Sequence, residues 1–98
     1  MYIIRFSKQA DKDKKSLKGA GLDGKAKVLL NMIAENPFQN PPPYEGLVGN
    51  LSGYYSRRIN LQHRLVYQVY NEPVSIDGVK YDGTIKVVRM WSHYDAVR

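Results

Sequence analysis

The hydrophobic and polar residues alternate at the start of the chain and follow a helical spacing in the segments after it. Residues 2–6 alternate around two β-branched residues, which predicts a short strand. Ser7 is a good N-cap for a helix over residues 8–18, in which only Ala10 and Leu17 are apolar anchors. This helix should therefore expose a face that consists mostly of lysine.

A second helical segment follows a break at Gly19–Gly21. Asp23 is placed to cap a helix over residues 24–35, in which apolar residues recur at i, i+3, i+4, i+7 and i+8. These apolar residues are Ala26, Leu29, Leu30, Ile33 and Ala34. A stripe of this width predicts a helix that packs against a sheet.

The rest of the chain alternates again, with turns and prolines between the strands. Residues 36–46 hold four of the five prolines, which favours a stiff loop over a helix or a central strand. Three strands are predicted over residues 53–60, 63–70 and 84–91. Residues 71–83 contain two Asp-Gly turn dipeptides, which predict a small extra hairpin before the last strand.

The order of these elements is β-α-α-β-β-β. It predicts an α+β fold in which two N-terminal helices pack on one face of a mainly antiparallel, four-stranded sheet. With 98 residues, the chain has room for one small domain, so we expect residues 1–98 to form a single domain without a separate cofactor-binding unit. Cysteine is absent and no apolar run suits a signal peptide or a membrane span, so a cytoplasmic protein without disulfides is expected.

The formal net charge of +6 is concentrated in two places. Residues 1–27 contain eight Lys and Arg against three Asp and Glu, and residues 57–70 contain three against none. A basic surface with eight Tyr, one Trp and two Phe suits RNA, because bases stack on aromatic rings while Lys and Arg neutralise phosphates. The alternative is a solvated lysine face that keeps the protein soluble.

Two arginines are expected to meet across the predicted hairpin. If Asn60–Gln62 form a three-residue loop, Arg58 lies directly opposite Arg64. Like charges in this position destabilise a strand pair by up to about 1 kcal/mol, so an anion between them is expected. That anion is either a bound phosphate or a structural carboxylate, for which Glu45 is best placed. Arg57 should point to the opposite face, where a structural ion pair is its expected role.

His93 and Tyr94 lie just beyond the last predicted strand. Histidine is the side chain that exchanges protons near neutral pH. In isolation, a histidine in such a position is usually an ordinary surface residue. Together with a loop carboxylate and the facing arginines, however, it forms the set that RNA backbone cleavage needs, which is an acid, a base and a phosphate clamp.

These residues belong to a longer run of specific sequence. It closely resembles the YoeB/Txe branch of the RelE toxin superfamily over residues 36–70 and 85–94, through Glu45-Gly46-Leu47, NLSGYYSRRI at 50–59, HRLVY at 63–67 and His93-Tyr94. The resemblance implies a RelE-like, microbial-RNase-like fold and a type II toxin. Such a toxin is an endoribonuclease that cleaves mRNA in the ribosomal A site, inhibits translation and is neutralised by a cognate antitoxin. Members of this branch commonly form homodimers.

The resemblance also implies a role for each candidate site residue. Glu45 is similar to the general base that takes the proton of the ribose 2′-hydroxyl, and His93 to the general acid for the departing 5′-oxygen. Arg64, with Arg58 beside it, would bind the scissile phosphate and its transition state. Tyr94 would position His93 or stack on a base of the message. The implied reaction is a transesterification that needs neither a metal nor a cofactor.

The chain departs from the family pattern in three places. Val48 and Gly46 stand where the family usually has Lys and Pro. Residues 71–83 form a longer insertion, and residues 95–98 extend past the His-Tyr pair. The extension either perturbs His93 or lies in solvent.

The sequence also permits two other functions. One is a toxin of the same fold that binds DNA gyrase and lacks the acid and base, and the other is a plain RNA- and ribosome-binding module. The N-terminal lysines either dock on ribosomal RNA by neutralising phosphates or only keep the protein soluble. They are Lys8, Lys12, Lys14, Lys15, Lys18, Lys25 and Lys27.

Overall fold

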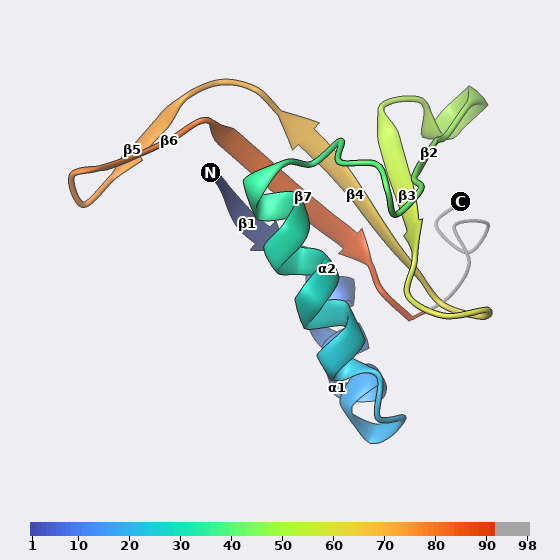
Figure 1. Cartoon of the computed structure of the whole chain (residues 1–98). Helices are drawn as coiled ribbons and strands as arrows, with labels where there is room; N and C mark the ends of the chain where they lie inside the picture. The colour runs from blue at the N-terminus through green and yellow to red at the C-terminus, as the bar shows by residue number, and fades with distance from the viewer. Residues whose placement is uncertain (92–98) are drawn as a thin grey trace.

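A five-stranded sheet with two helices on one of its faces forms the body of the protein (Figure 1). The computed structural model describes residues 1–91. The elements in chain order are β1 (Tyr2–Phe6), α1 (Lys8–Gly19), α2 (Asp23–Glu35), β2 (Glu45–Gly46), the 3-10 helix η1 (Gly49–Leu51), β3 (Tyr54–Arg58), β4 (Arg64–Tyr70), β5 (Val74–Ile76), β6 (Val79–Tyr81) and β7 (Gly83–Arg89). The predicted α+β class and element order are confirmed.

The strands of the main sheet lie in the order β1-β7-β4-β3-β2. β1 runs parallel to β7, and the other neighbours are antiparallel, as expected for a mainly antiparallel sheet. The sheet has one strand more than predicted, because Glu45 and Gly46 pair with Ser56 and Tyr55 at the edge. The proline-rich loop therefore ends as a short edge strand.

The insertion at residues 71–83 forms the predicted small hairpin, in which β5 and β6 make a separate two-stranded sheet. Asp77 and Gly78 at its tip have φ values of 49° and 78°, the left-handed conformation that a tight hairpin turn requires. Figure 1 shows this hairpin projecting away from the helices and the rest of the sheet.

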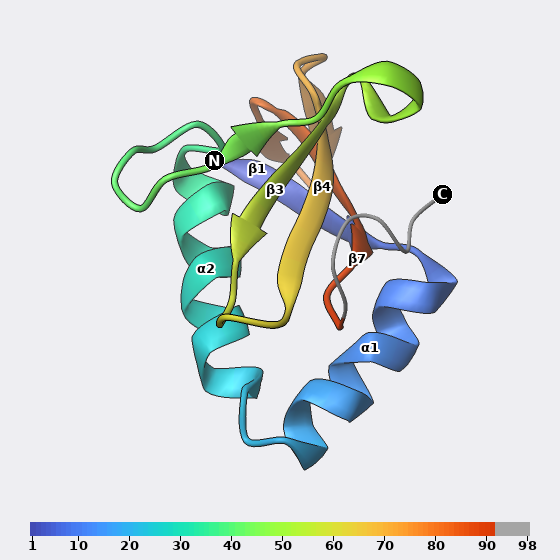
Figure 2. The ribbon, with the colours of Figure 1, turned by 90° about the vertical axis from the view of Figure 1, so that its right-hand side faces the viewer.

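The main core lies between the helices and the sheet. Figure 2 shows α2 along the left side of the sheet and α1 at the lower right, converging toward the turn that joins them. The inward-facing residues of the strands and the apolar stripes of the helices are buried together, and they include Leu65, Tyr67, Ile85 and Val87 from the strands and Ala10, Leu17, Ala26 and Ile33 from the helices. Both helices thus cover one face, as predicted.

The starts of the two helices differ in how they are capped. The Ser7 hydroxyl accepts a hydrogen bond from the Ala10 N–H at 3.0 Å, which confirms the predicted N-cap of α1. The prediction that Asp23 caps the second helix is wrong, because Asp23 is the first residue of α2 and the cap position belongs to Leu22, which makes no side-chain capping bond. Asp23 still adds negative charge to the first turn, which complements the helix dipole.

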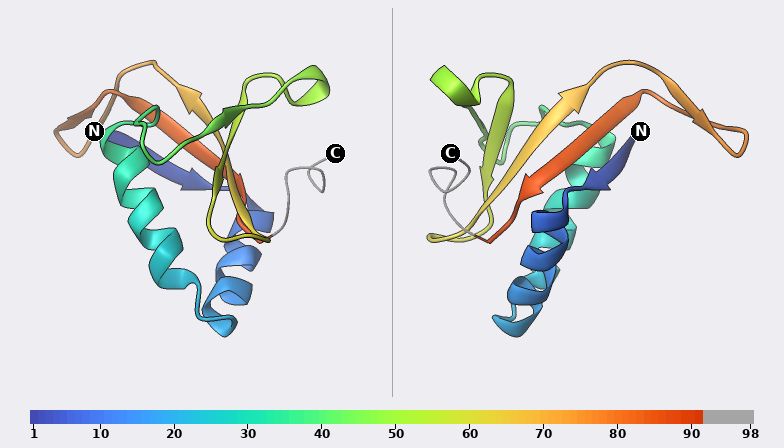
Figure 3. Two further views of the ribbon diagram at one scale, coloured as in Figure 1. Left: turned by 45° about the vertical axis from the view of Figure 1, so that its right-hand side comes forward. Right: turned by 180° about the vertical axis from the view of Figure 1, so that it is seen from behind.

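The other face of the sheet has a smaller apolar cluster. Leu47, Leu51 and Val66 are buried there, with Tyr54 and Val88 packed against them. The left view of Figure 3 shows the segment with η1 projecting at the upper right, away from both helices. Within residues 1–91, neither helix has the length and apolar composition needed to cross a bilayer.

Candidate active site

The hairpin of β3 and β4 places two arginines opposite each other. Arg58 pairs with Arg64 in the strand register, as predicted. The turn between them spans residues 60–62 and is fixed by the Asn60 side-chain oxygen, which accepts hydrogen bonds from the N–H groups of Gln62 and His63 at 2.9 and 2.6 Å. Arg58 is exposed and has no acidic partner among residues 1–91.

Glu45 lies on the same face of the sheet as these arginines. It stands beside Ser56 in the register of β2 and β3, and one of its oxygens is 3.9 Å from a terminal nitrogen of Arg64. This distance is too long for a hydrogen bond and marks a loose ion pair. The Glu45 side chain is 54% exposed and that of Arg64 is 19% exposed, so the carboxylate is accessible while the guanidinium is held by its surroundings.

A cleft of about 430 Å³ opens beside the edge of β3. Glu45, Arg58 and Arg64 line it together with Ser56, whose hydroxyl is 3.5 Å from the Arg64 guanidinium. The proline-rich loop forms the facing wall, through Pro42, Pro43 and Tyr44. The structure therefore brings three of the five candidate catalytic residues into one open, basic cleft.

Arg57 points to the opposite face from Arg58, as predicted, and is 1% exposed. Its guanidinium donates hydrogen bonds to the Tyr67 hydroxyl and to three main-chain carbonyls of the proline-rich loop, at 2.7–3.1 Å; the carbonyls are those of Pro37, Gln39 and Pro42. The expectation that Arg57 forms an ion pair is wrong for the described chain, because these neutral oxygens occupy its donors. Arg57 instead fixes the loop that leads to Glu45.

Tyr67 completes this buried network. Its hydroxyl donates a hydrogen bond to the Pro37 carbonyl at 2.8 Å and accepts one from Arg57. Burial raises the pKa of Tyr67 above its usual value of 10.0, although the hydrogen bond from Arg57 acts in the opposite direction. Tyr67 is therefore a neutral part of the core at physiological pH.

His93 and Tyr94 lie outside the described residues. The described chain reaches Trp91, whose ring stacks on the ring of His63 with a centroid distance of 4.0 Å and an interplanar angle of 15°. His63 directly precedes Arg64 in the sequence.

Five candidate docking lysines project from α1. All are exposed, and they are Lys8, Lys12, Lys14, Lys15 and Lys18. Lys14 forms an ion pair with Asp11 at 3.1 Å and also lies 3.4 Å from the centroid of the Phe6 ring. The other four lysines are exposed, so their ammonium groups are available to neutralise phosphates.

Reasoning from the sequence missed two buried polar residues. Ser56 is 1% exposed, and its hydroxyl lies near the Arg64 guanidinium. Strand alternation could have identified it, because Ser56 stands two residues before Arg58 and therefore on the same face of the strand. Asp13 is 2% exposed, and the signal for it was helical spacing, since Asp13 lies three residues after Ala10 and four before Leu17.

Comparisons with known proteins agree with this architecture. Residues 6–94 match the family of YoeB-like toxins of bacterial type II toxin-antitoxin systems. The toxin YoeB of Synechocystis sp. is 42% identical over 69 residues, which are 70% of this chain and 73% of that protein.

Solved structures give the same result over nearly the whole length of this chain. The YoeB dimer from Staphylococcus aureus is 36% identical with a TM-score of 0.73, over 95% of this chain and 98% of that one. The heterotetrameric YoeB-YefM toxin-antitoxin complex from the same organism contains a chain that is 36% identical with a TM-score of 0.70, over 96% and 99% of the two chains. The chain therefore belongs to the YoeB-like toxin family of bacterial type II toxin-antitoxin systems.

Proposed function

We propose that this protein is a ribosome-dependent endoribonuclease that cleaves mRNA in the A site and so inhibits translation. The observation that supports this best is the cleft in which an accessible Glu45 carboxylate lies 3.9 Å from Arg64, opposite an exposed Arg58. A carboxylate that served only to neutralise the arginines would be expected to form close, hydrogen-bonded contacts. Here it is free to accept a proton from a bound substrate.

The proposed reaction is a transesterification in which the RNA supplies its own nucleophile. Glu45 takes the proton of a ribose 2′-hydroxyl, and the 2′-oxygen attacks the adjacent phosphorus. The bond from phosphorus to the 5′-oxygen breaks, and His93 donates a proton to that oxygen. The products are a 2′,3′-cyclic phosphate and a 5′-hydroxyl, so atoms and charge balance without a further reactant.

The two arginines stabilise the negative charge that develops on the phosphate. The guanidinium group of Arg64 is partly buried and close to Ser56, which orients it before substrate arrives. Arg58 faces it from the other strand, so that a phosphate between them is bound from two sides and the like-charge repulsion is relieved. Such preorganised charge stabilises a transition state more than flexible surface charge does.

The proposed partners follow from the family and the charge. The relatives from Staphylococcus aureus form a YoeB dimer and a complex with the antitoxin YefM, and we propose both a homodimer and a cognate antitoxin for this chain. An acidic antitoxin segment would suit the basic cleft and the lysines of α1. The place of action would be the cytoplasm, where ribosomes translate.

Primer extension on translated mRNA tests this proposal. We expect wild-type protein to produce breaks at codon positions, and Glu45→Ala and His93→Ala each to reduce cleavage by about 100-fold or more, because each loses one proton-transfer step. Glu72→Ala is a matched control, since Glu72 is an exposed glutamate in the insertion and should cleave like wild type.

The same assay separates the competing functions. Breaks that are undiminished in both Glu45→Ala and His93→Ala would refute the assigned acid and base. If wild type binds ribosomes but produces no breaks, the protein is an RNA-binding module, and if it binds gyrase instead, it is a gyrase inhibitor. The acid, base and arginine set favours the nuclease over both.

A further inference from the structure

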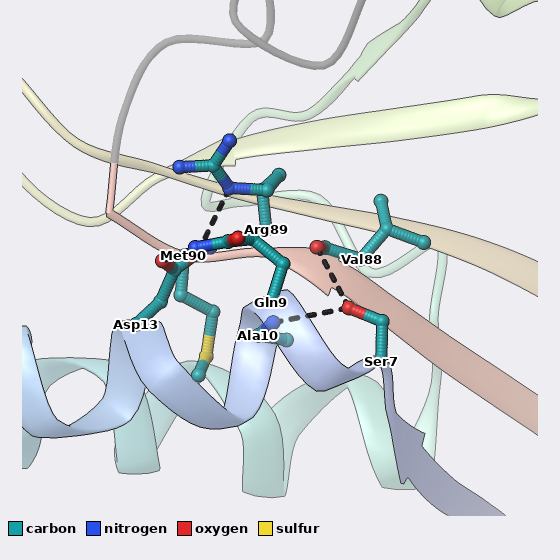
Figure 4. A network of polar contacts seen from close by, with 7 residues as sticks. All are labelled: Ser7, Gln9, Ala10, Asp13, Val88, Arg89 and Met90. Carbon is teal, nitrogen blue, oxygen red and sulfur yellow. Dashed lines mark hydrogen bonds and ion pairs between the residues drawn. The ribbon is translucent and has the colours of Figure 1, made fainter.

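A buried acid on α1 contacts the end of the last strand. The side chain of Asp13 is 3% exposed, and one of its oxygens accepts hydrogen bonds from the Met90 N–H at 2.9 Å and from the Arg89 Nε at 3.0 Å. Its other oxygen accepts one from the Gln9 side chain at 3.1 Å. Figure 4 shows these residues between α1 and the end of β7.

Asp13 continues a row of main-chain contacts beyond the end of β1. β1 pairs with β7 up to Val87, whose carbonyl also accepts a hydrogen bond from the Ser7 N–H at 2.9 Å. The Ser7 hydroxyl then donates to the Val88 carbonyl at 2.9 Å, and Asp13 accepts from Met90 (Figure 4). Side-chain oxygens thus hold the edge of β7 on the side where β1 has ended, while β4 still pairs with Arg89 on the other side.

A carboxylate is a costly way to fill this position if packing is its only purpose. Burying a charge carries a desolvation penalty, and an apolar residue of similar volume on a helix face is commonly as stable or more stable. Here three donors from three residues satisfy the carboxylate, and one of them is a main-chain N–H. A hydrogen bond to the main chain fixes the position and direction of the backbone. Apolar packing is less directional and constrains the backbone less.

A second contact holds the same segment from the opposite side. Trp91 stacks on His63, which belongs to the turn between β3 and β4. Residues 89–91 are therefore held by Asp13 of α1 and by His63 of the β3–β4 hairpin. We call this arrangement the β7 clamp. His93 follows two residues after it.

We propose that the β7 clamp positions the general acid for cleavage, with Asp13 and His63 as positioning residues. The inference rests on the proposed function, because His93 is the acid in that reaction. Asp13 sets the direction in which the chain leaves β7, and the stack on His63 fixes Trp91 against the residue that precedes β4. Since a displacement of about 1 Å costs on the order of 100-fold in rate, removal of either interaction should slow the chemical step without weakening ribosome binding.

The test compares Asp13→Asn with Asp11→Asn. Both remove one negative charge from α1, but Asp11 is an exposed acid whose partner is Lys14. Single-turnover cleavage on programmed ribosomes gives the rate of the chemical step and, from its dependence on ribosome concentration, the affinity. For Asp13→Asn we expect a rate about 10-fold or more below wild type with the affinity within about 2-fold, and for Asp11→Asn no change in the rate.

Tryptophan fluorescence gives a readout that does not depend on cleavage. Trp91 is the only tryptophan of the chain, so its emission reports on the clamp alone. Asp13→Asn should make Trp91 more accessible to quenching by acrylamide, while Asp11→Asn should leave it as in wild type. If the emission, the quenching and the cleavage rate of Asp13→Asn all equal those of wild type, the clamp is refuted.

The outcomes also separate the clamp from the function on which it rests. If Glu45→Ala abolishes cleavage while Asp13→Asn cleaves at the wild-type rate, the nuclease stands and the clamp has no role in positioning. If wild type does not cleave, the proposed function and the positioning role fall together. If far-UV circular dichroism shows that Asp13→Asn is unfolded, Trp91→Phe and Trp91→Leu take its place in the test. Trp91→Phe keeps a stacking ring and should cleave, whereas Trp91→Leu lacks the ring and should not. Equal cleavage rates in these two variants would refute the clamp.

Discussion

Arg57 and Arg58 are adjacent in the sequence, but Arg57 is buried and Arg58 is exposed. Strand alternation predicted that Arg57 and Arg58 point to different faces, and the register confirms it. The partners of Arg57 could not be predicted, because they are carbonyls of a loop 15–20 positions away, and a main-chain carbonyl leaves no trace in the sequence. The loose pairing of Glu45 with Arg64 was predicted only as one of two alternatives.

Arg57→Met should destabilise the fold. Methionine fills much of the same space but leaves the Gln39 and Pro42 carbonyls without a donor and removes one hydrogen bond each from the Pro37 carbonyl and the Tyr67 hydroxyl, so we expect the free energy of unfolding to fall by about 2–4 kcal/mol in urea denaturation. Arg58→Met is the matched control. Arg58 is exposed and faces another arginine, so its replacement should change the free energy of unfolding by less than about 0.5 kcal/mol. Equal losses in the two variants would contradict the structural role of Arg57.

At the scale of elements, periodicity predicted the helices and long strands but not the shortest strand. β2 has two residues and follows a run of prolines, so neither its length nor its composition gave a signal. The same is true of the β-bulge between Val66 and Tyr67, which arises from the fit of β4 to β7. Of the two features, β2 bears on the cleft directly, because its Glu45 is one of the lining residues.

The β5–β6 hairpin should be dispensable. It forms its own two-stranded sheet, and none of its residues belongs to either core cluster. Replacing residues 74–81 by a short glycine-containing turn should change the free energy of unfolding by less than about 1 kcal/mol and leave cleavage as in wild type. Thermal unfolding and primer extension measure the two effects.

The neck of the hairpin provides the contrasting control. A Cβ at Gly83 would lie 2.0 Å from the Tyr70 carbonyl oxygen and 3.1 Å from the Asn71 Cα, so Gly83→Ala should cost about 1–3 kcal/mol. A shortened hairpin that is less stable than Gly83→Ala would contradict the independence of this element. It would also assign the insertion a structural role in the sheet.

For the whole molecule, charge and topology are the properties that matter. The net charge of +6 and its concentration on α1 were readable from the sequence, and the structure adds that the lysines of α1 are exposed. The parallel pairing of β1 with β7 was not predicted, because the alternation within a strand says nothing about which strand lies beside it. Sequence signals therefore described the surface charge better than the long-range contacts.

Ribosome binding should depend on salt through these lysines. Replacing Lys8, Lys12, Lys15 and Lys18 with Gln should weaken binding and make the plot of log affinity against log salt shallower by about 0.7–0.9 for each phosphate that is no longer neutralised. Lys80→Gln, on the distant hairpin, should change neither the affinity nor the slope. If the fourfold variant keeps the wild-type affinity and slope, these lysines only keep the protein soluble.

The parallel pairing of β1 with β7 also has a consequence for biosynthesis. β1 is among the first parts of the chain to be made, yet its neighbour in the sheet is the last strand of the described chain, and Figure 1 shows the two side by side. The pair of β1 and β7 cannot form until β7 has left the ribosome. The five-stranded sheet is therefore completed only after its second strand in spatial order, β7, has been made, so the folding of the sheet follows the synthesis of β7.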